Sequence, residues 1–461
     1  MSKVQTATDS VLDRVISLSS TATAEDAGYL ASALEKTAGS GTIADIQQAG
    51  VDAQANLTNL ADQKITEIQS LSSNNNSGLG DITVVDSAAI PLVTDESFTE
   101  NTSAAYRCLV KENGNSFAIS ALFSSSNPAK AQATMTPFSV SSEGSITAYN
   151  PVAIWSNTSQ QSVSTTSFSH VPGTGKVLGA GHNAYPGGGN RFGYFYARLQ
   201  NGSVSNVGYA ADGVSHYTNG CFGGIAVPGG FTALYPGYQQ SDSKARTMKV
   251  DYSGSTPTVT AHDLSSNTST NYVTPFISQP GVSNPGIGGI SSFSTSASAR
   301  YLRIWAGDLS SVNDTATPYW LSHSTSIAFV LSNGNVALYS QYINRLYSSP
   351  SSYIEIDNSF PATLHLCNSG RFESVGQDIW VGYDFQGRFV YLLRINPTTG
   401  EPEIIDSHDV SLAVGPSSST SYIQMFTAGN NHEFLVFMPS HNGSLQTITV
   451  IDNPLSIPTE A

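Results

Sequence analysis

Charged residues are scarce in this sequence. Only 11% of its 461 residues are Asp, Glu, Lys or Arg, against about a quarter in an average protein. The 34 acidic residues outnumber the 19 basic ones, so the net charge is −15, and Lys and Arg form no run. Binding to nucleic acid or to an anionic membrane draws on clustered positive charge, so we expect neither partner.

Cysteines and long apolar segments are also scarce. The three cysteines, Cys108, Cys221 and Cys367, lie more than 100 residues apart, which excludes a CxxC pair, zinc-ligand spacing and a dense disulfide framework. We therefore expect no metal and no cofactor. The longest apolar runs, such as Ile327–Leu331, are too short to span a bilayer, and the first ten residues lack the apolar stretch of a secretory signal. We expect synthesis in a cytoplasm without membrane insertion.

The common catalytic motifs are missing as well. There is no Gly-x-Ser-x-Gly elbow and no His-Glu-x-x-His helix, and the phosphate-loop pattern fails around Gly173–Lys176. One turn, Tyr383–Phe389, is an imperfect Asp box of the kind found in sialidase propellers. Acids that could pair for glycoside cleavage are Asp378, Asp384, Glu401, Glu403 and Asp406. Solvated turn acids are the better interpretation, so we expect no enzymatic activity.

Serine, glycine and aromatic residues are plentiful instead. The chain has 69 serines and 40 glycines, and 10% of its residues are aromatic, which is typical of short strands joined by polar turns. From residue 81 onward, pairs of short alternating strands recur around Gly or Pro turns. The turns are centred on Gly144, Gly202, Gly254, Gly307–Ser311, Ser349–Pro350, Pro397–Gly400 and Asn442–Gly443. Seven units of about 50 residues predict a seven-bladed β-propeller over 81–461. Six or eight blades, or an array of sandwiches, remain open.

Closure of the ring supports this prediction. The last unit supplies only three strands, Tyr422–Thr427, Glu433–Met438 and Leu445–Ile451, whereas Ile82–Val85 reads as a strand without a neighbour. Pairing this N-terminal strand into the last blade gives that blade four strands and removes an open sheet edge.

Residues 1–80 differ from the rest in kind. Residues 1–71 have helical apolar spacing, and their longest predicted helix begins at Thr42. One apolar stripe cannot form a monomeric core, so we expect a short, imperfect coiled coil that attaches and oligomerises the chain, with a trimer favoured. The stripe positions assigned to self-association are Ile46, Ala53, Leu57, Leu60, Ile65, Ile68 and Leu71. The alternative is a helix folded back on its own domain. Residues 72–80 read as a flexible linker.

A glycine-rich loop, Gly179–Arg191, is the most distinctive segment of the β region. Its polar and aromatic residues would lie on a pliable surface, and exposed rings stack on sugar faces. The candidate ligand-binding residues are His182, Asn183, Tyr185, Arg191, Trp305 and Trp320. The alternative for the rings is that they fill space between the blades.

The first predicted helices carry a family resemblance. The segments Val11–Ser20 and Thr21–Glu35 resemble the N-termini of virion structural proteins from marine tailed bacteriophages. The resemblance covers under a tenth of the chain. It implies a tail fibre or similar appendage whose N-terminal helices bind other virion proteins and whose distal β domain faces the host. We therefore expect a virion protein that adheres to a host cell-surface glycan or protein. A glycan depolymerase on the same propeller and a non-binding decoration protein are the alternatives.

Overall fold

The structure is a computed structural model that describes most of residues 82–458. The undescribed stretches within this range are 95–101, 127–128, 158–163, 183–191, 201, 212–223, 240–243, 264–270, 283–284, 296–298, 319–320, 322–325, 358–371, 385–388, 415–423, 440 and 443–444. The chain divides into two compact units, 1–80 and 81–461. The predicted helices of residues 1–71, the linker 72–80 and all seven self-association positions lie outside the described residues.

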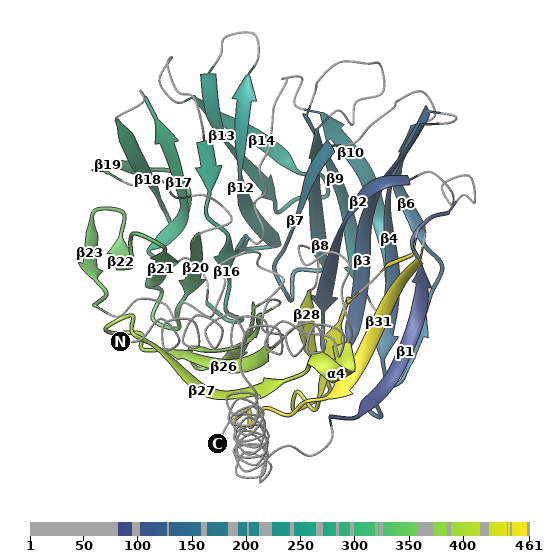
Figure 1. Ribbon diagram of the computed structural model, residues 1–461. Coiled ribbons are helices and arrows are strands. Elements are labelled where there is room, and N and C mark those ends of the chain that lie inside the picture. The colour runs from purple at the N-terminus through teal and green to yellow at the C-terminus, as the bar shows by residue number, and fades with distance from the viewer. Residues whose placement is uncertain are drawn as a thin grey trace, which may run out of the picture. The chain divides into compact units, whose positions relative to one another are not determined.

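The first three sheets follow one another along the chain and lie next to one another (Figure 1). Sheet 1 contains β2 (Thr102–Glu112), β3 (Ser116–Ser126), β4 (Ala129–Val140) and β5 (Ile146–Ala148), with β6 (Val152–Asn157) also paired to β4. Sheet 2 contains β7 (Ser164–His170), β8 (Lys176–His182), β9 (Phe192–Gln200) and β10 (Ser203–Ala211). Sheet 3 contains β11 (Ile225–Val227), β12 (Gly230–Gln239), β13 (Lys244–Tyr252) and β14 (Thr258–Asp263).

The remaining four sheets continue in chain order. Sheet 4 contains β15 (Asn271–Val273), β17 (Ile287–Ser294), β18 (Arg300–Ala306) and β19 (Val312–Thr317). Sheet 5 contains β16 (Phe276–Ile277), β20 (Ser326–Val330), β21 (Val336–Ser340), β22 (Arg345–Ser349) and β23 (Ser352–Glu355). Sheet 6 contains β24 (Phe372–Gly376), β25 (Ile379–Asp384), β26 (Phe389–Ile395) and β27 (Pro402–Asp409). Sheet 7 contains β28 (Met425–Ala428), β29 (Phe434–Phe437), β30 (His441–Asn442), β31 (Leu445–Asp452) and β1 (Val84–Pro91).

Apolar side chains fill the space between neighbouring sheets. Residues of sheet 7, such as Val436 and Val450, share one cluster with Leu109 and Phe117 of sheet 1. Equivalent clusters join the other neighbours around the ring. Burial of these facing surfaces closes seven sheets into a ring. The protein is therefore mainly β and has a seven-bladed propeller arrangement, as the repeat predicted.

The last sheet joins the two ends of the β region. Its outer strand β1 pairs antiparallel with β31, from Val84 opposite Ile451 to Pro91 opposite Leu445. The paired segment runs further toward the C-terminus than the Ile82–Val85 segment singled out in the sequence. Ile90 has no exposed surface because it packs into the cluster between sheets 7 and 1.

One strand crosses from its own blade to the next. After β15 in sheet 4 the chain forms β16, which pairs parallel with β20 of sheet 5, and then returns to sheet 4 as β17. We call Thr274–Gln279 the crossing segment. The Ala328 N–H donates to the Pro275 carbonyl at 2.9 Å, and the Thr274 and Ser326 hydroxyls lie 3.1 Å apart. This departure from the repeat brings backbone to the centre of the ring.

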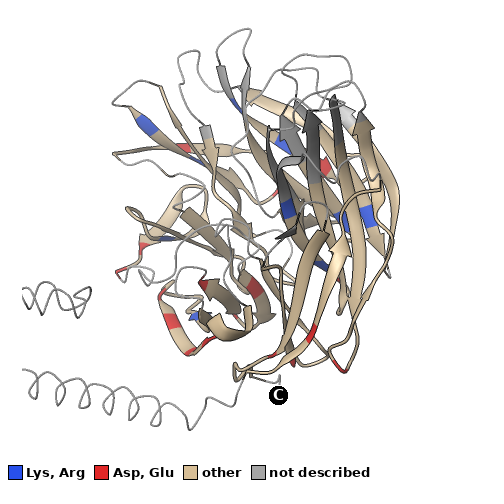
Figure 2. Ribbon diagram, turned by 45° about the vertical axis from the view of Figure 1, so that its right-hand side comes forward, with Lys and Arg blue, Asp and Glu red and all other residues tan. Residues whose placement is uncertain are grey.

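The described part of the fold contains little helix and few charged residues. The described part of the chain has one short helix, α4 (Ser411–Val414), and no helix there is long and apolar enough to cross a membrane. Charged residues are thinly scattered over the sheets (Figure 2).

Candidate functional site

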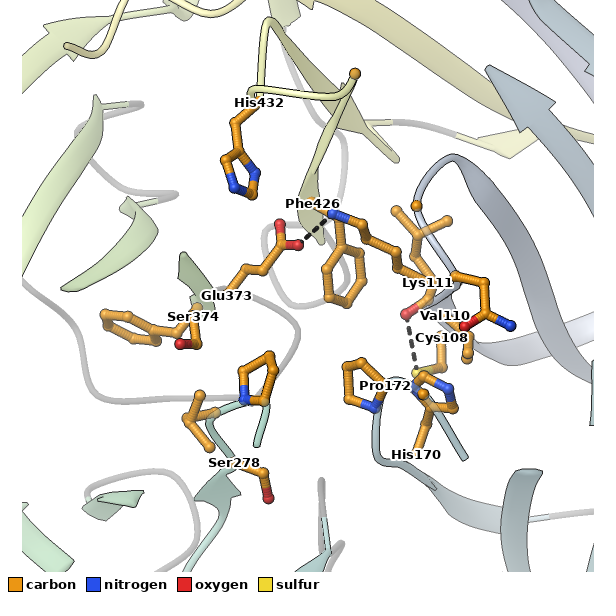
Figure 3. A pocket seen from close by; sticks show the side chains of 18 of the residues that line it. Cys108, Val110, Lys111, His170, Pro172, Ser278, Glu373, Ser374, Phe426 and His432 are labelled. Carbon is orange, nitrogen blue, oxygen red and sulfur yellow. Dashed lines mark hydrogen bonds and ion pairs between the residues drawn. The ribbon is translucent and has the colours of Figure 1, made fainter. Parts of the chain in front are cut away.

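A cavity of about 410 Å³ lies at the centre of the ring. Its wall comes from five places: the end of β2, the β7–β8 turn, the crossing segment, β24, and β28 with its following turn (Figure 3). The residues that line it are Cys108, Leu109, Val110, Lys111, Asn113, Gly114, His170, Pro172, Gly173, Phe276, Ile277, Ser278, Pro280, Phe372, Glu373, Ser374, Phe426, Gly429, Asn430 and His432. Its volume is within the range of small-molecule sites, about 300–1,000 Å³.

Strand β2 positions two functional side chains on opposite sides. Successive residues of a strand point to opposite faces. Leu109 packs toward sheet 7 and Val110 toward sheet 2. By the same alternation, Lys111 reaches Thr427 of sheet 7, while Glu112 reaches His170 of sheet 2. One strand therefore presents a cation and a carboxylate to different neighbours.

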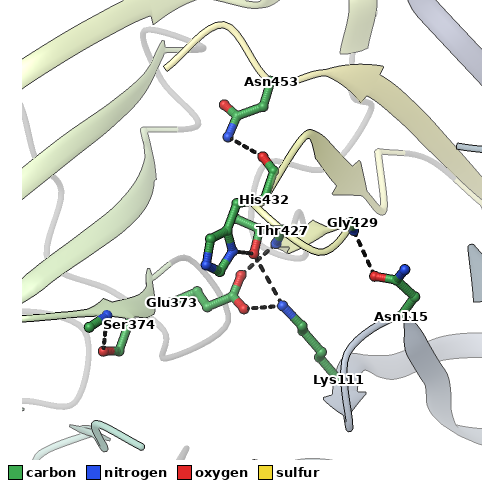
Figure 4. A network of polar contacts seen from close by, with 9 residues as sticks. Lys111, Asn115, Glu373, Ser374, Thr427, Gly429, His432 and Asn453 are labelled. Atoms are coloured by element: carbon green, nitrogen blue, oxygen red, sulfur yellow. Dashed lines mark hydrogen bonds and ion pairs between the residues drawn. The ribbon is translucent and has the colours of Figure 1, made fainter. Parts of the chain in front are cut away.

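Lys111 is the centre of a polar network beside the cavity (Figure 4). Its Nζ donates to Glu373 Oε1 at 2.5 Å and to the Thr427 hydroxyl at 3.1 Å. The Thr427 backbone N–H donates to the other Glu373 oxygen at 2.5 Å. The Lys111 and Glu373 side chains are 13% and 10% exposed, so this ion pair is largely shielded from water and its geometry is well fixed.

His432 adjoins the network through the Thr427 hydroxyl. That hydroxyl accepts the Lys111 N–H and lies 2.6 Å from His432 Nδ1, with which it shares a hydrogen bond. Burial lowers the pKa of His432, with the Lys111 cation adding to the effect, and the carboxylates of Glu373 and Glu433 oppose it. The lowered pKa favours the neutral imidazole at pH 7.

The turn that carries His432 is anchored by two hydrogen bonds. His432 has a φ of 60°, in the left-handed region. The Asn453 amide donates to its carbonyl at 2.7 Å, and the Gly429 N–H donates to Asn115 Oδ1 at 2.7 Å. These bonds join β28 to the β2–β3 turn and to the end of β31, and they fix the imidazole in place.

A second ionisable pair stands on the sheet 2 side of the cavity. His170 Nε2 lies 2.7 Å from Glu112 Oε2. The Glu112 side chain is completely buried, and its other oxygen has no hydrogen-bond partner among the described residues. Burial raises the pKa of the nearby Cys108 thiol to about 12, so this thiol is protonated at neutral pH and is not a nucleophile.

Aromatic rings and prolines make up much of the remaining cavity wall, and Asn113, Ser278, Ser374 and Asn430 are further polar residues that line it. Phe276 of the crossing segment, Phe372 of β24 and Phe426 of β28 contribute rings, and Pro172 and Pro280 contribute further apolar surface. A ligand here would place a nonpolar face on rings and its polar groups on the Lys111 network. In the described part of the chain, no three His, Cys, Asp or Glu residues are grouped to hold a metal ion.

Most of the sequence-based binding candidates are not tested by the described residues. Asn183, Tyr185, Arg191 and Trp320 lie outside the described residues, and His182 ends strand β8.

The prediction that Trp305 lies at a binding surface is wrong. Its side chain is 1% exposed and packs in the cluster that joins sheets 2, 3 and 4. Its ring meets His262 edge-on, with centroids 4.7 Å apart, and its N–H donates to the Ser291 hydroxyl at 3.4 Å. A ring enclosed in this way cannot stack on a sugar, because both of its faces are already in contact with the protein.

The acids considered for glycoside cleavage make structural contacts. Asp378 and Asp384 are buried, at 4% and 8% exposed. Asp378 accepts bonds from the Ser332 N–H and hydroxyl, and Glu403 lies 3.5 Å from Arg394 on the outer strands. None of these acids lines the cavity.

The fold and the cavity define a seven-bladed β-propeller with a ligand-sized hollow on its axis. No family model matches the chain, and no curated protein is significantly similar to it in sequence. Three solved structures illustrate its structural neighbours. The β-propeller domain of the Trilobed protease from Pyrococcus furiosus has a TM-score of 0.38 and 10% identity, over 78% of this chain and 97% of that chain.

The other two neighbours are named as enzymes. The periplasmic gluconolactonase of Pseudomonas aeruginosa has a TM-score of 0.33 and 9% identity, over 66% of this chain and 96% of that one. The hemagglutinin-neuraminidase ectodomain of parainfluenza virus 5 has a TM-score of 0.35 and 9% identity, over 89% and 98%. At this level of similarity their activities are not transferred to this chain.

Proposed function

We propose that this protein is a bacteriophage virion appendage, such as a tail fibre. Its N-terminal helices attach to the particle and associate with copies of themselves, and its propeller binds a host cell-surface glycan in the axial cavity. The sequence of residues 11–35 supports the attachment. The observation that supports binding is the cavity itself, which combines aromatic walls with the fixed Lys111–Glu373 network.

We propose binding without cleavage. Glycoside hydrolysis uses two carboxyl groups that flank the bond. Glu373 is the one carboxylate among the described residues that line the cavity, and Lys111 neutralises it. Adhesion needs no such pair, and several copies on one particle raise a weak single-site affinity by orders of magnitude.

The test uses the full chain on a panel of marine bacterial strains. We expect labelled protein to bind some strains and to lose binding after mild periodate oxidation of their surface glycans. Lys111→Met should reduce binding. The matched control, Asp314→Asn on outer strand β19, should leave binding unchanged. Asp314 is 36% exposed and is distant in sequence from the residues that line the cavity. Failure to bind any strain, or binding that survives periodate, contradicts the proposal.

A parallel assay decides between adhesion and cleavage. The full chain is incubated with envelope polysaccharide from a bound strain, and reducing ends are measured. We expect none to be released. Sustained release that is abolished by Asp378→Ala, Asp384→Ala or Glu403→Ala would favour the depolymerase instead.

A further inference from the structure

We propose that the axial cavity recognises a neutral sugar unit through two adjacent hydroxyl groups, one accepting a hydrogen bond from Lys111 and the other donating one to Glu373. This inference rests on the proposed glycan-binding function and names the chemical class of the ligand.

The charge balance of the cavity selects a neutral ligand. Lys111 and Glu373 are the charged residues among those described that line it, and their atoms lie 2.5 Å apart. His170 lies against the buried carboxylate of Glu112, and His432 is neutral. An anionic ligand would find no spare cation and would meet the Glu373 carboxylate. A cationic ligand would meet the Lys111 ammonium.

The remaining hydrogen-bonding capacity matches a pair of hydroxyls. The Lys111 ammonium has three N–H groups, of which Glu373 and Thr427 take two. Each Glu373 oxygen accepts one bond from this network and has no second partner among the described residues, which leaves a lone pair for a ligand. A hydroxyl both donates and accepts, so adjacent hydroxyls on a ring can use the donor and the acceptor together.

The walls fit the other side of a sugar ring. The C–H face of a pyranose is apolar, and aromatic rings present a complementary surface at low entropic cost. Phe276, Phe372 and Phe426 come from three different blades and all line the cavity. An apolar wall with a few fixed polar groups is the usual composition of a small-molecule site.

The polar groups are already held in their bonded positions. Thr427 fixes Glu373 and Lys111, and Asn115 and Asn453 fix the turn that carries His432. Binding therefore orders few side chains, which favours affinity for a small ligand. The His432 imidazole also lines the cavity beside the pair.

The test measures binding of simple sugars to the full chain by saturation-transfer NMR and calorimetry. The probes are the methyl glycosides of glucose, galactose and mannose, with glucuronate as the acidic probe. We expect at least one neutral glycoside to bind, and its affinity to be unchanged between about 0.05 and 0.5 M NaCl, because no net charge is exchanged. Tighter, salt-sensitive binding of glucuronate, or no binding of any neutral glycoside, overturns the inference.

Deoxy sugars test the two-hydroxyl geometry without altering the protein. Removal of either of two adjacent hydroxyls from the bound glycoside should weaken binding about tenfold or more, as for loss of one charge-assisted bond. Removal of any other hydroxyl should have less effect. If equal losses occur at all positions, or none at any, the Lys111–Glu373 pair is not the recognition element.

Protein variants complete the test. Glu373→Gln and Lys111→Met should each weaken binding about tenfold or more, and the double variant should lose less than the product of the two, because the residues act as one unit. Near-UV circular dichroism establishes that each variant is folded. A folded Glu373→Gln protein with unchanged affinity contradicts the inference.

The two proposals fail in different ways. Full chain that adheres to cells but binds none of the neutral glycosides overturns the inference and leaves adhesion standing. Full chain that binds a neutral glycoside with the expected hydroxyl dependence, yet adheres to no strain, supports the inference and overturns the adhesion function.

Discussion

The side chain of Gln279 and residue Asp378 are hydrogen-bonded to each other twice. Gln279 Nε2 donates to Asp378 Oδ1 at 3.1 Å, and the Asp378 backbone N–H donates to Gln279 Oε1 at 3.0 Å. Asp378 also accepts two bonds from Ser332. The β24–β25 turn of sheet 6 thus holds both the β20–β21 turn of sheet 5 and the crossing segment, next to Pro280 in the cavity wall.

Replacement of Gln279 by Ala should lower the free energy of unfolding by about 1–3 kcal/mol, because it leaves the buried Asp378 N–H without its partner and removes one of the bonds to the Asp378 carboxylate. Urea denaturation measures the loss. Asn333→Ala is the control, since Asn333 makes an exposed bond to the Pro397 carbonyl at 2.8 Å, and it should change stability by no more than about 0.5 kcal/mol. Equal losses of stability in the two variants would show that the pair of hydrogen bonds between Gln279 and Asp378 has no special role.

Closure by β1 can be tested by shortening the chain. A chain that starts at Asp81 should fold cooperatively, whereas one that starts at Asp95 should aggregate or melt at a much lower temperature. The shorter chain leaves the edge of β31 unpaired and removes Ile90 and Leu92 from the sheet 7–sheet 1 core. Thermal unfolding of both chains decides the point, and equal melting temperatures would argue against the closure.

Two glycines with similar backbone angles should differ in their tolerance of a side chain. Gly144 and Gly281 have φ values of 81° and 78°. A Cβ at Gly144 would lie 2.6 Å from Val85 Cγ1 and 3.0 Å from Phe434 Cε1, whereas a Cβ at Gly281 would meet nothing within 4 Å.

Both substitutions to Ala carry the backbone strain of about 1–2 kcal/mol. Gly144→Ala should cost about 1–3 kcal/mol more, because the turn is pressed against β1. Chemical denaturation of the two variants measures this difference, and a smaller loss for Gly144→Ala than for Gly281→Ala would contradict the packing at that turn.

His432 should make stability depend on pH. Its pKa in the folded protein is below the ordinary 6.5, so the unfolded chain binds the proton more readily. Stability should be full above pH 6.5 and should fall as pH drops below that value, until the folded protein is also protonated. Urea midpoints at about pH 7.5, 6.5 and 5.5 measure the fall.

His432→Gln should make that fall smaller, since Gln keeps an acceptor for the Thr427 hydroxyl and does not titrate. Burial also lowers the pKa of His262, so some pH dependence should persist in this variant and should decrease further in a double variant with His262→Gln. If stability falls with pH as steeply in the single and the double variant as in the unsubstituted protein, these two imidazoles are not the source of the pH dependence.

Self-association through residues 46–71 remains a prediction. Replacing Leu60 and Ile68 with Asp would bury charges in a helix–helix interface, at a cost of several kcal/mol to the assembly. Mass measurement in solution should show an oligomer, with a trimer favoured, before the substitutions and a monomer after them. A monomeric unsubstituted chain would contradict the prediction.

The repeat could be predicted because it is local. Six of the seven predicted turns join the two strands at the outer edge of a blade, as at Gly254 between β13 and β14. Such hairpins follow from period-2 alternation and turn residues a few positions apart. The seventh turn, at Asn442, instead precedes the third strand of its sheet, β31. The outermost strand there, β1, comes from the other end of the propeller.

The cavity network could not be predicted in the same way. Lys111 and Glu373 are 262 residues apart and each lies in an ordinary strand, so their pairing depends on ring geometry and not on any short motif. For Trp305 the sequence pattern failed in a different way, because it did not show that the ring is buried. Middle strands of a blade are covered on both faces by neighbouring blades, so alternation along β18 does not reveal which rings are exposed. The crossing segment was missed because a two-residue strand leaves no periodic pattern.

During synthesis, strand β1 is made long before β31, the strand with which it pairs. The Ser87 and Thr449 hydroxyls lie 3.5 Å apart across the β1–β31 pair, but 362 residues separate them in the chain. At 5–20 residues per second, a ribosome needs about 20–70 s to make that interval. Throughout it, Ile90 has no sheet to join. Asp86 and Pro91, a charge and a missing donor within β1, disfavour pairing with strands of other nascent chains. The yield of intact rings should therefore depend on translation speed and on chaperones that shield this one strand.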